Sequence, residues 1–343
     1  MILKRKNIVL IWLLAGALLV FSMVIVGGIT RLSNSGLSMV EWKLIMGAIP
    51  PLSEDAWQTT FEKYQQFPEY QKINYEMDLV QFKSIFWWEY IHRTLGRFVG
   101  LVFIFPFAFF ILRKWLDLNL IRKCLVMFSL GALQGFFGWY MVKSGLVNDP
   151  HVSHYRLAIH LITATILFGY ILWVMMDLWH RAGRNEDESF NSIRKLSKLL
   201  LGLILLQVVY GAFVAGLDAG KAYNTFPLMG DSLVAEGVTA MSPFWKNFTE
   251  GLAGVQFVHR YLAYAIVLVV GWIWLKGRKL NLSRGSNSAV VMVIVIVIVQ
   301  FLLGVLTLIN AVPMTLAIMH QLGAMLLFVT SIYLYYQMGR RQV

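Results

Sequence analysis

The feature that most constrains this chain is a series of long apolar segments with almost no charged residues. A helix needs about 20 residues to cross the hydrocarbon core of a bilayer. Eight segments are long enough: 8–28, 85–112, 121–142, 156–178, 196–216, 252–275, 288–309 and 315–337. Continuous apolar runs are typical of helices, whereas barrel strands alternate. The sequence therefore predicts an all-α integral membrane protein with eight transmembrane helices.

Composition and charge agree with this class. Of the 343 residues, 58% are hydrophobic and 14% are charged, whereas a soluble domain carries about 25% charged residues. The net charge is +12. Its basic residues concentrate at the N-terminus, after the even-numbered segments and at the C-terminus, which the positive-inside rule places in the cytoplasm. The charge thus indicates topology, with both termini inside, and not nucleic-acid binding.

The first segment is expected to be a retained helix, because it runs past twenty residues without a cleavage site of small residues. No Arg- and Ser-rich transit segment precedes it, which favours a bacterial cytoplasmic membrane. The single cysteine, Cys124, rules out a disulfide within the chain and a cluster of thiolate metal ligands.

Histidines recur at one place in the even-numbered segments. Each of these segments has a histidine just inside its outer end and a small residue four positions later: His92 and Gly96, His160 and Ala164, His259 and Ala263, His320 and Ala324. Residues four apart share one helix face. The small residue therefore leaves a bare patch of helix surface one turn below each imidazole. A flat macrocycle lying on the helix would need this space.

The odd-numbered segments repeat as well, which divides the chain into two similar halves. Three of them carry Gln-x3-Gly, at Gln134, Gln207 and Gln300, and the first has Met23 at the glutamine position. Because each half has four segments, the halves share one orientation, and the repeat is parallel about an axis along the membrane normal. We expect two four-helix bundles in a pseudo-twofold arrangement, residues 1–185 and 186–343.

The first outer loop, residues 31–84, is long and contains a short amphipathic helix. Trp57, Phe61, Tyr64 and Phe67 recur there at helical spacing. Such a helix lies on the membrane surface or packs on its own protein, and the sequence leaves both readings open.

Four membrane histidines at matched depth favour haem iron as their ligand. The repeat predicts one pair in each half, His92 with His160 and His259 with His320. Zinc and copper sites usually add Cys, Asp or further His close by. Near these histidines the sequence offers only one other potential metal ligand, Glu89. Histidines that are merely hydrogen-bonded inside a bundle are the remaining alternative.

Arginines accompany these histidines. Arg93 and Arg260 directly follow a candidate ligand, and Arg156 precedes His160 by one turn. A guanidinium can bind a haem propionate through two parallel hydrogen bonds. Alternatively, these side chains extend to the lipid headgroups.

The two halves differ at one ionisable residue. Glu89 lies three residues before His92, whereas Gln256 lies three residues before His259. A haem that carries electrons needs no acid, so the carboxylate indicates proton delivery or substrate positioning in one half. We therefore assign the chemistry to the N-terminal half and electron storage to the C-terminal half.

With these motifs in place, the chain resembles the haem A synthase family over nearly its whole length. The segments that carry the resemblance are Gly27-Gly28-Ile29-Thr30-Arg31-Leu32-Ser33-Asn34-Ser35-Gly36-Leu37-Ser38, Glu41-Trp42-Lys43, Glu89-x-x-His92-Arg93, Tyr155-Arg156-Leu157-Ala158-x-His160, Val258-His259-Arg260 and His320-Gln321. The resemblance implies oxidation of the C8 methyl of haem O to a formyl group by successive oxygen-dependent hydroxylations.

The resemblance also implies how the sites are used. A haem b cofactor would lie on His259 and His320, the substrate haem O would be held or flanked by His92 and His160, and Glu89 matches the family's essential glutamate. Partners would be a haem O synthase and a membrane or quinol electron donor. The chain departs from those members that carry a cysteine pair in the outer loops, and resembles the cysteine-less branch, so a thiol relay is excluded.

Two other functions fit parts of the pattern. A dihaem electron-transfer cytochrome of b type would use the same histidine pairs, although it would not need Glu89. A transporter would explain the repeat, but its spans are usually broken at mid-membrane in matched positions, which this sequence does not show.

Overall fold

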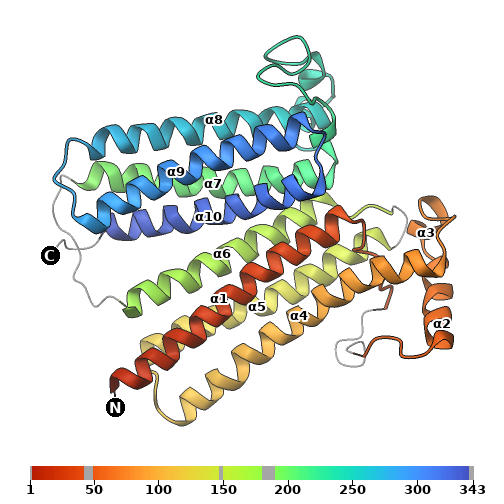
Figure 1. Ribbon diagram of the computed structural model, residues 1–343, viewed down its shortest axis with the longest axis horizontal. Coiled ribbons are helices and arrows are strands. Elements are labelled where there is room, and N and C mark those ends of the chain that lie inside the picture. Colours follow the sequence, from red (N-terminus) through yellow and green to blue (C-terminus); the bar gives the residue numbers. More distant parts are fainter. Residues whose placement is uncertain (1, 42–48, 147–149, 180–189, 340–343) are drawn as a thin grey trace. The chain divides into compact units, whose positions relative to one another are not determined.

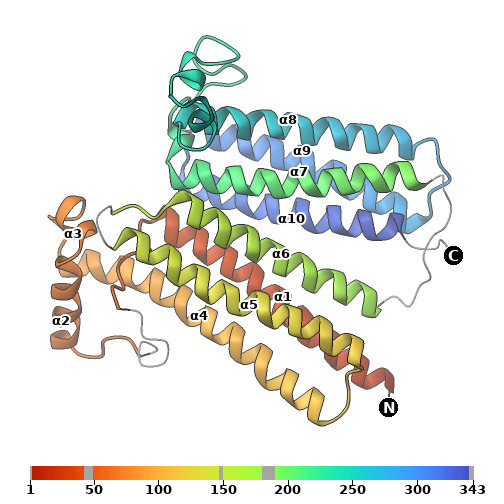
Figure 2. The same ribbon diagram turned by 180° about the vertical axis from the view of Figure 1, so that it is seen from behind.

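The computed structural model describes residues 2–41, 49–146, 150–179 and 190–339, and the chain forms two compact units, Met1–Phe168 and Gly169–Val343 (Figures 1 and 2). The boundary predicted at residues 185 and 186 lies outside the described residues, as do Trp42 and Lys43 of the family motif. The division at 185 and 186 stays a prediction.

In the described ranges, eight helices have the length and apolar composition of membrane spans. They are α1 (Ile2–Leu32), α4 (Leu79–Leu112), α5 (Leu118–Gly145), α6 (His154–Trp179), α7 (Asn191–Gly216), α8 (Leu252–Gly277), α9 (Arg284–Ile309) and α10 (Met314–Met338). Each contains one predicted segment, and no strand occurs in the described ranges. The all-α, eight-span class is confirmed, whereas the twofold relation of the halves stays a prediction.

The spanning helix α4 starts six residues before its apolar segment because of a capping box. The Asp78 side chain accepts a hydrogen bond from the backbone N–H of Gln81 at 2.8 Å, and the Gln81 side chain accepts one from the Asp78 N–H at 3.1 Å. Two of the unpaired donors at the helix start are thereby satisfied. The added turns of α4 provide a surface on which the first outer loop packs.

Two short helices of that loop, α2 (Glu54–Gln65) and α3 (Pro68–Lys72), contain the amphipathic stretch. Trp57, Phe61 and Tyr64 of α2 form a buried cluster with Phe82 and Phe86 of α4. The Trp57 and Phe86 ring centroids are 4.9 Å apart. Of the two readings that the sequence leaves open, the contacts support packing on the protein itself (Figure 1).

A buried acid in α3 makes the stability of this loop depend on pH. Glu69 is 6% exposed and accepts a hydrogen bond from the Tyr64 hydroxyl at 3.0 Å. Burial raises the pKa of Glu69 to about 8, the Tyr64 hydrogen bond lowers it in part, and the charge of Glu89 raises it. The unfolded carboxyl loses its proton near the ordinary value of 4.5, whereas the folded one keeps it up to about 8.

We therefore expect the free energy of unfolding to fall as the pH rises from about 4.5 to 8, because the folded state binds more protons in this window. Glu69→Gln, which cannot ionise, should flatten this slope in thermal unfolding curves recorded from pH 5 to 9. The exposed Glu62 of α2 offers a matched control as Glu62→Gln. An unchanged slope in Glu69→Gln would contradict the assignment.

A long-range hydrogen bond compensates for the proline inside α4. Pro106 has no N–H, so the carbonyl of Val102, one turn earlier, lacks its normal helical donor. The Trp12 indole of α1 donates to this carbonyl at 2.8 Å and also lies on the ring of Phe103. In a bilayer no water can replace that donor, so the bond joins α1 to α4 deep in the unit.

Trp12→Phe is expected to destabilise the protein by about 1 kcal/mol, because the Val102 carbonyl then stays unpaired. In a Pro106→Ala background the alanine N–H supplies the missing donor, so the same Trp12→Phe change should cost less. Thermal unfolding of the four variants in detergent measures the difference. Equal costs in both backgrounds would assign the effect to ring packing alone.

In the second unit, α7, α8, α9 and α10 pack in a closed ring, with α7 beside α8, α8 beside α9, α9 beside α10, and α10 beside α7 (Figure 2). The long loop between α7 and α8 contains three short 3₁₀ helices: η3 (Ala219–Lys221), η4 (Glu236–Thr239) and η5 (Phe244–Phe248).

The turns after α1 and α7 are alike. Asn34 and Asp218 both adopt a left-handed backbone, with φ of 50° and 53°, which Asn and Asp tolerate better than most residues. Each lies two residues before a glycine, Gly36 and Gly220. Both turns have the sequence Asx-small-Gly, Asn34-Ser35-Gly36 after α1 and Asp218-Ala219-Gly220 after α7, with the left-handed residue at the same place.

Candidate functional site

Each candidate histidine meets a glycine of the preceding spanning helix. A Cβ atom placed on the glycine would lie close to Cε1 of the imidazole, at 3.0 Å for Gly27 and His92, 3.4 Å for Gly138 and His160, 3.5 Å for Gly211 and His259, and 2.9 Å for Gly304 and His320. At the two shortest distances even alanine would displace the ring. The glycines of the repeat therefore make space for the histidines, and four similar helix pairs result.

The histidine pair of the second unit is suited to holding one metal ion. The ring centroids of His259 and His320 are 6.4 Å apart, with an angle of 74° between the ring planes. An iron at about 2 Å from a nitrogen of each imidazole would need ring centres about 6 Å apart. Within the described part of the chain, the Nδ1 atoms of both rings are buried without a hydrogen-bond partner.

The two histidines of the first unit, His92 and His160, differ in the hydrogen bonding of their Nδ1 atoms. When the Gln134 amide of α5 is oriented so that both its nitrogen and its oxygen have hydrogen-bond partners, the nitrogen donates to Nδ1 of His160 at 3.1 Å. Nδ1 of His92 is buried, and no residue of the described ranges bonds to it. His92 lies one turn above Gly96, whose bare face is covered by the methyl group of Met23.

The few potential ligand side chains suit a metal ion that receives most of its ligands from a cofactor. In the described ranges, no three His, Cys, Asp or Glu side chains converge as metal ligands. A structural zinc ion takes four protein ligands and a catalytic one takes three. Haem iron takes four nitrogens from the macrocycle and needs the protein for its axial positions alone. Two facing imidazoles with a small residue one turn below each therefore fit haem.

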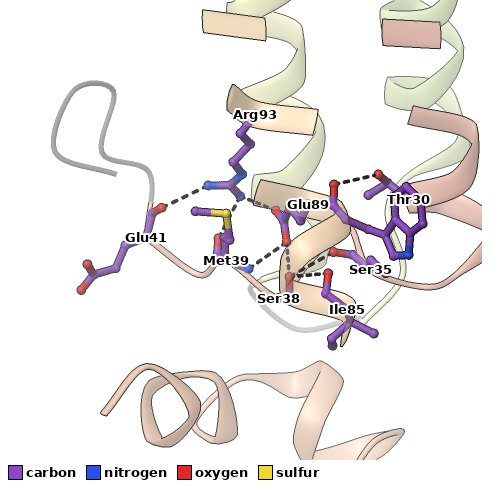
Figure 3. Close-up of polar contacts among 9 residues, drawn as sticks. Thr30, Ser35, Ser38, Met39, Glu41, Ile85, Glu89 and Arg93 are labelled. Carbon is purple, nitrogen blue, oxygen red and sulfur yellow. Dashed lines mark hydrogen bonds and ion pairs between the residues drawn. The ribbon is translucent and has the colours of Figure 1, made fainter. Parts of the chain in front are cut away.

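The carboxylate of Glu89 lies in a dense network of hydrogen bonds at the start of the first outer loop (Figure 3). It is 2% exposed. One oxygen accepts from the Ser38 hydroxyl at 2.7 Å and from the Met39 N–H at 2.8 Å, and the other pairs with Arg93 at 2.5 Å. Glu89 therefore attaches the loop that follows α1 to the helix that carries His92.

Arg93 completes this attachment. Its guanidinium donates to the carbonyl of Met39 at 2.8 Å and to that of Glu41 at 3.1 Å (Figure 3). The Ser38 hydroxyl also donates to the Ser35 carbonyl at 3.2 Å. Charge-assisted hydrogen bonds are the stronger kind, and the ion pair is shielded from solvent, so residues 38–41 are held firmly on α4.

The second unit repeats this arrangement with an amide in place of the acid. The Gln256 side chain donates to the carbonyls of Ala219 and Tyr223, at 2.9 and 3.2 Å. Arg260 donates to three loop carbonyls: Tyr223 at 2.7 Å, Thr225 at 2.9 Å and Leu228 at 3.1 Å. Here the loop presents carbonyls to the residue at this position, whereas the first loop presents donors, which explains why one half has Gln and the other has Glu.

The three arginines predicted to bind propionates have protein partners. Arg93 and Arg260 bond to loop carbonyls, and Arg156 of α6 donates to the Tyr140 carbonyl at 2.7 Å with its guanidinium 3.8 Å from the centre of the Tyr140 ring. Propionate binding by these residues stays a prediction. The loop contacts were missed from the sequence, where Ser38 stands out only as the last residue of a family motif and Met39 belongs to none of the motifs.

Comparisons with known proteins agree with the arrangement of these residues. The COX15-CtaA family, described as "Cytochrome oxidase assembly protein", matches residues 10–332. A Flavobacterium johnsoniae protein named "Heme A synthase" is 45% identical over 98% of this chain and 99% of its own length. Proteins of that name from Flavobacterium psychrophilum and Nitrosospira multiformis are 46% and 45% identical, each over 96% of this chain, and over 98% and 93% of their own lengths. On this agreement over nearly its full length, the chain belongs to the COX15-CtaA family of cytochrome oxidase assembly proteins.

Proposed function

We propose that this chain is a haem A synthase, which oxidises the C8 methyl group of haem O to a formyl group by successive oxygen-dependent hydroxylations. The observation that carries the proposal is the pair of facing imidazoles in the second unit, 6.4 Å apart and with both Nδ1 atoms buried and unpaired in the described structure. The shared identity with full-length relatives of that name supports it.

We assign a haem b cofactor to His259 and His320, and the substrate haem to His92 and His160. When bound, haem b supplies single electrons at an iron whose potential its axial ligands set. The residues of the chain would hold and orient the two groups: the four glycines lie against the imidazoles and position them, while the surface of Gly96 below His92 is covered by the methyl group of Met23. Glu89, which the resemblance matches to the family's essential glutamate, supports placing the chemistry in the N-terminal half.

Of the two roles open to Glu89, the contacts support positioning over proton delivery. Both oxygens of its carboxylate are engaged, one by Ser38 and Met39 of the loop and the other by Arg93. Glu89 thereby orders the loop beside His92, where the methyl group to be oxidised would have to be held still. Arg93, Arg156 and Arg260 remain proposed partners of the propionates.

We infer a bacterial cytoplasmic membrane location, with both termini cytoplasmic and the haem sites towards the outer face. The distribution of basic residues supports this orientation, and the eight spanning helices support the multi-pass topology. Partners by chemistry would be the enzyme that makes haem O and a membrane or quinol donor of electrons. The halves 1–185 and 186–343 would carry the substrate site and the haem b site.

The test is haem extraction followed by chromatography and mass spectrometry on protein made in a host that produces haem O. Haem b together with haem O, or with its hydroxylated or formyl products, is the expected result. Haem b alone, with no conversion when haem O and a reductant are supplied, would indicate the dihaem electron-transfer cytochrome instead.

A further inference from the structure

Two of the four histidine turns accept a hydrogen bond from an amide of the neighbouring helix, a third has an amide packed against it, and in the described structure the fourth has no amide beside it. Gln134 of α5, Gln207 of α7 and Gln300 of α9 each lie one turn before the glycine that meets the histidine. The matching residue of α1, one turn before Gly27, is Met23.

The amides act on the backbone of the helix turn that carries the histidine. Gln134 donates to the carbonyl of His160 at 3.2 Å and accepts from the N–H of Ala164 at 2.9 Å. Gln207 donates to the carbonyl of His259 at 3.0 Å, and its amide nitrogen lies 3.3 Å from the imidazole. The Gln300 amide oxygen lies 2.1 Å from where a Cβ of Gly323 would be, so it packs directly against the turn of His320, although no described residue bonds to it.

Met23 cannot make such a bond. Its thioether is at best a weak acceptor and has no N–H to donate. Its methyl group packs over Gly96, at 3.5 Å from where a Cβ would be. Methionine is also the most adaptable of the apolar side chains. The turn of His92 is therefore held on α1 by apolar contact, while the other three are held by hydrogen bonds or direct amide packing.

We propose that Met23 is a positioning residue that makes His92 the exchangeable ligand of the four. This deepens the proposed function on which it rests. A site that takes in a haem substrate and releases a haem product must break its axial contacts in every turnover, whereas a resident cofactor must stay bound. One imidazole with a fixed turn, His160, and one with an adjustable turn, His92, meet the first demand. In the second unit an amide lies against both turns, bonded to that of His259 and packed on that of His320, which meets the second demand.

The proposal is tested by haem release, which needs no turnover. The full-length protein is loaded with protohaem in detergent and mixed with excess apomyoglobin as a haem acceptor. Release should follow a fast phase from the first unit and a slow phase from the second. Met23→Gln should slow the fast phase roughly three- to tenfold, the effect of one added hydrogen bond, and leave the slow phase unchanged.

Two further variants separate this role from a general effect on packing. Met23→Leu keeps an apolar side chain of similar size and should leave both phases as they are. Gln207→Met removes the amide next to His259 and should speed the slow phase by a similar factor. The Soret spectrum of each loaded variant reports whether both imidazoles remain bound before release begins.

Equal release from Met23→Gln and Met23→Leu would overturn the proposal, and so would an unchanged slow phase in Gln207→Met. If Met23→Gln does not fold, the Gln207→Met result decides. Failure of the proposed function would be seen separately, as wild-type protein that releases haem in two phases but does not convert haem O.

Discussion

His259→Ala is expected to remove the haem of the second unit and with it nearly all formation of haem A. His259 and His320 have ring centroids 6.4 Å apart, so that both would hold the iron of the proposed haem. Loss of one imidazole leaves the iron with a single protein ligand. About half of the bound haem should be lost in a pyridine haemochrome assay, because the histidine pair of the first unit is unchanged.

Added imidazole provides a sharp control for this variant. The bare backbone of Gly211 lies beside the missing ring, and the alanine leaves a space in which free imidazole can bind the iron. Haem content should recover with imidazole in His259→Ala, and it should not depend on imidazole in His151→Ala, which changes an exposed histidine of the second outer loop. A full haem content in His259→Ala without imidazole would contradict the assignment.

Glu89→Gln should leave both haems bound and lower haem A formation on the order of a hundredfold, the effect of misplacing reacting groups by about 1 Å. The amide has one oxygen to accept hydrogen bonds, whereas the carboxylate accepts from Ser38, Met39 and Arg93 with two. The loop after α1 would therefore lose part of its attachment next to His92. Haem content and haem A yield, measured on the same preparation, separate binding from chemistry.

Two companions to this variant identify the role of the acid. Glu41→Gln removes an exposed carboxylate from the same loop and should keep near-normal activity. Ser38→Ala leaves Glu89 ionisable but removes one loop contact, and should lower activity by about tenfold if the acid acts by positioning, since one hydrogen bond to a charged group contributes about 1.5–3 kcal/mol. Normal activity in Ser38→Ala with a shifted pH profile would favour proton delivery instead.

The local properties of the chain were predictable because each depends on neighbours in sequence. Apolar length alone determines the eight spanning helices, and all eight were found where the sequence placed them. The spacing of four determines that each histidine has a small residue one turn below it. The Asx-small-Gly pattern after α1 and α7 likewise predicts tight turns, and both turns have a left-handed residue at the same place.

The tertiary structure decided what the polar groups do, because their partners lie far away in sequence. Ser38 and Met39 reach Glu89 across 51 and 50 positions, and the Trp12 indole reaches the carbonyl left unpaired by Pro106 across 90. No periodicity encodes such contacts, since they arise when packed helices bring their backbones together. For the same reason, the sequence shows that α1 has Met23 where the other odd-numbered spans have a glutamine. Only the fold shows that glutamines at this position, such as Gln134 and Gln207, bond to the turn of a histidine.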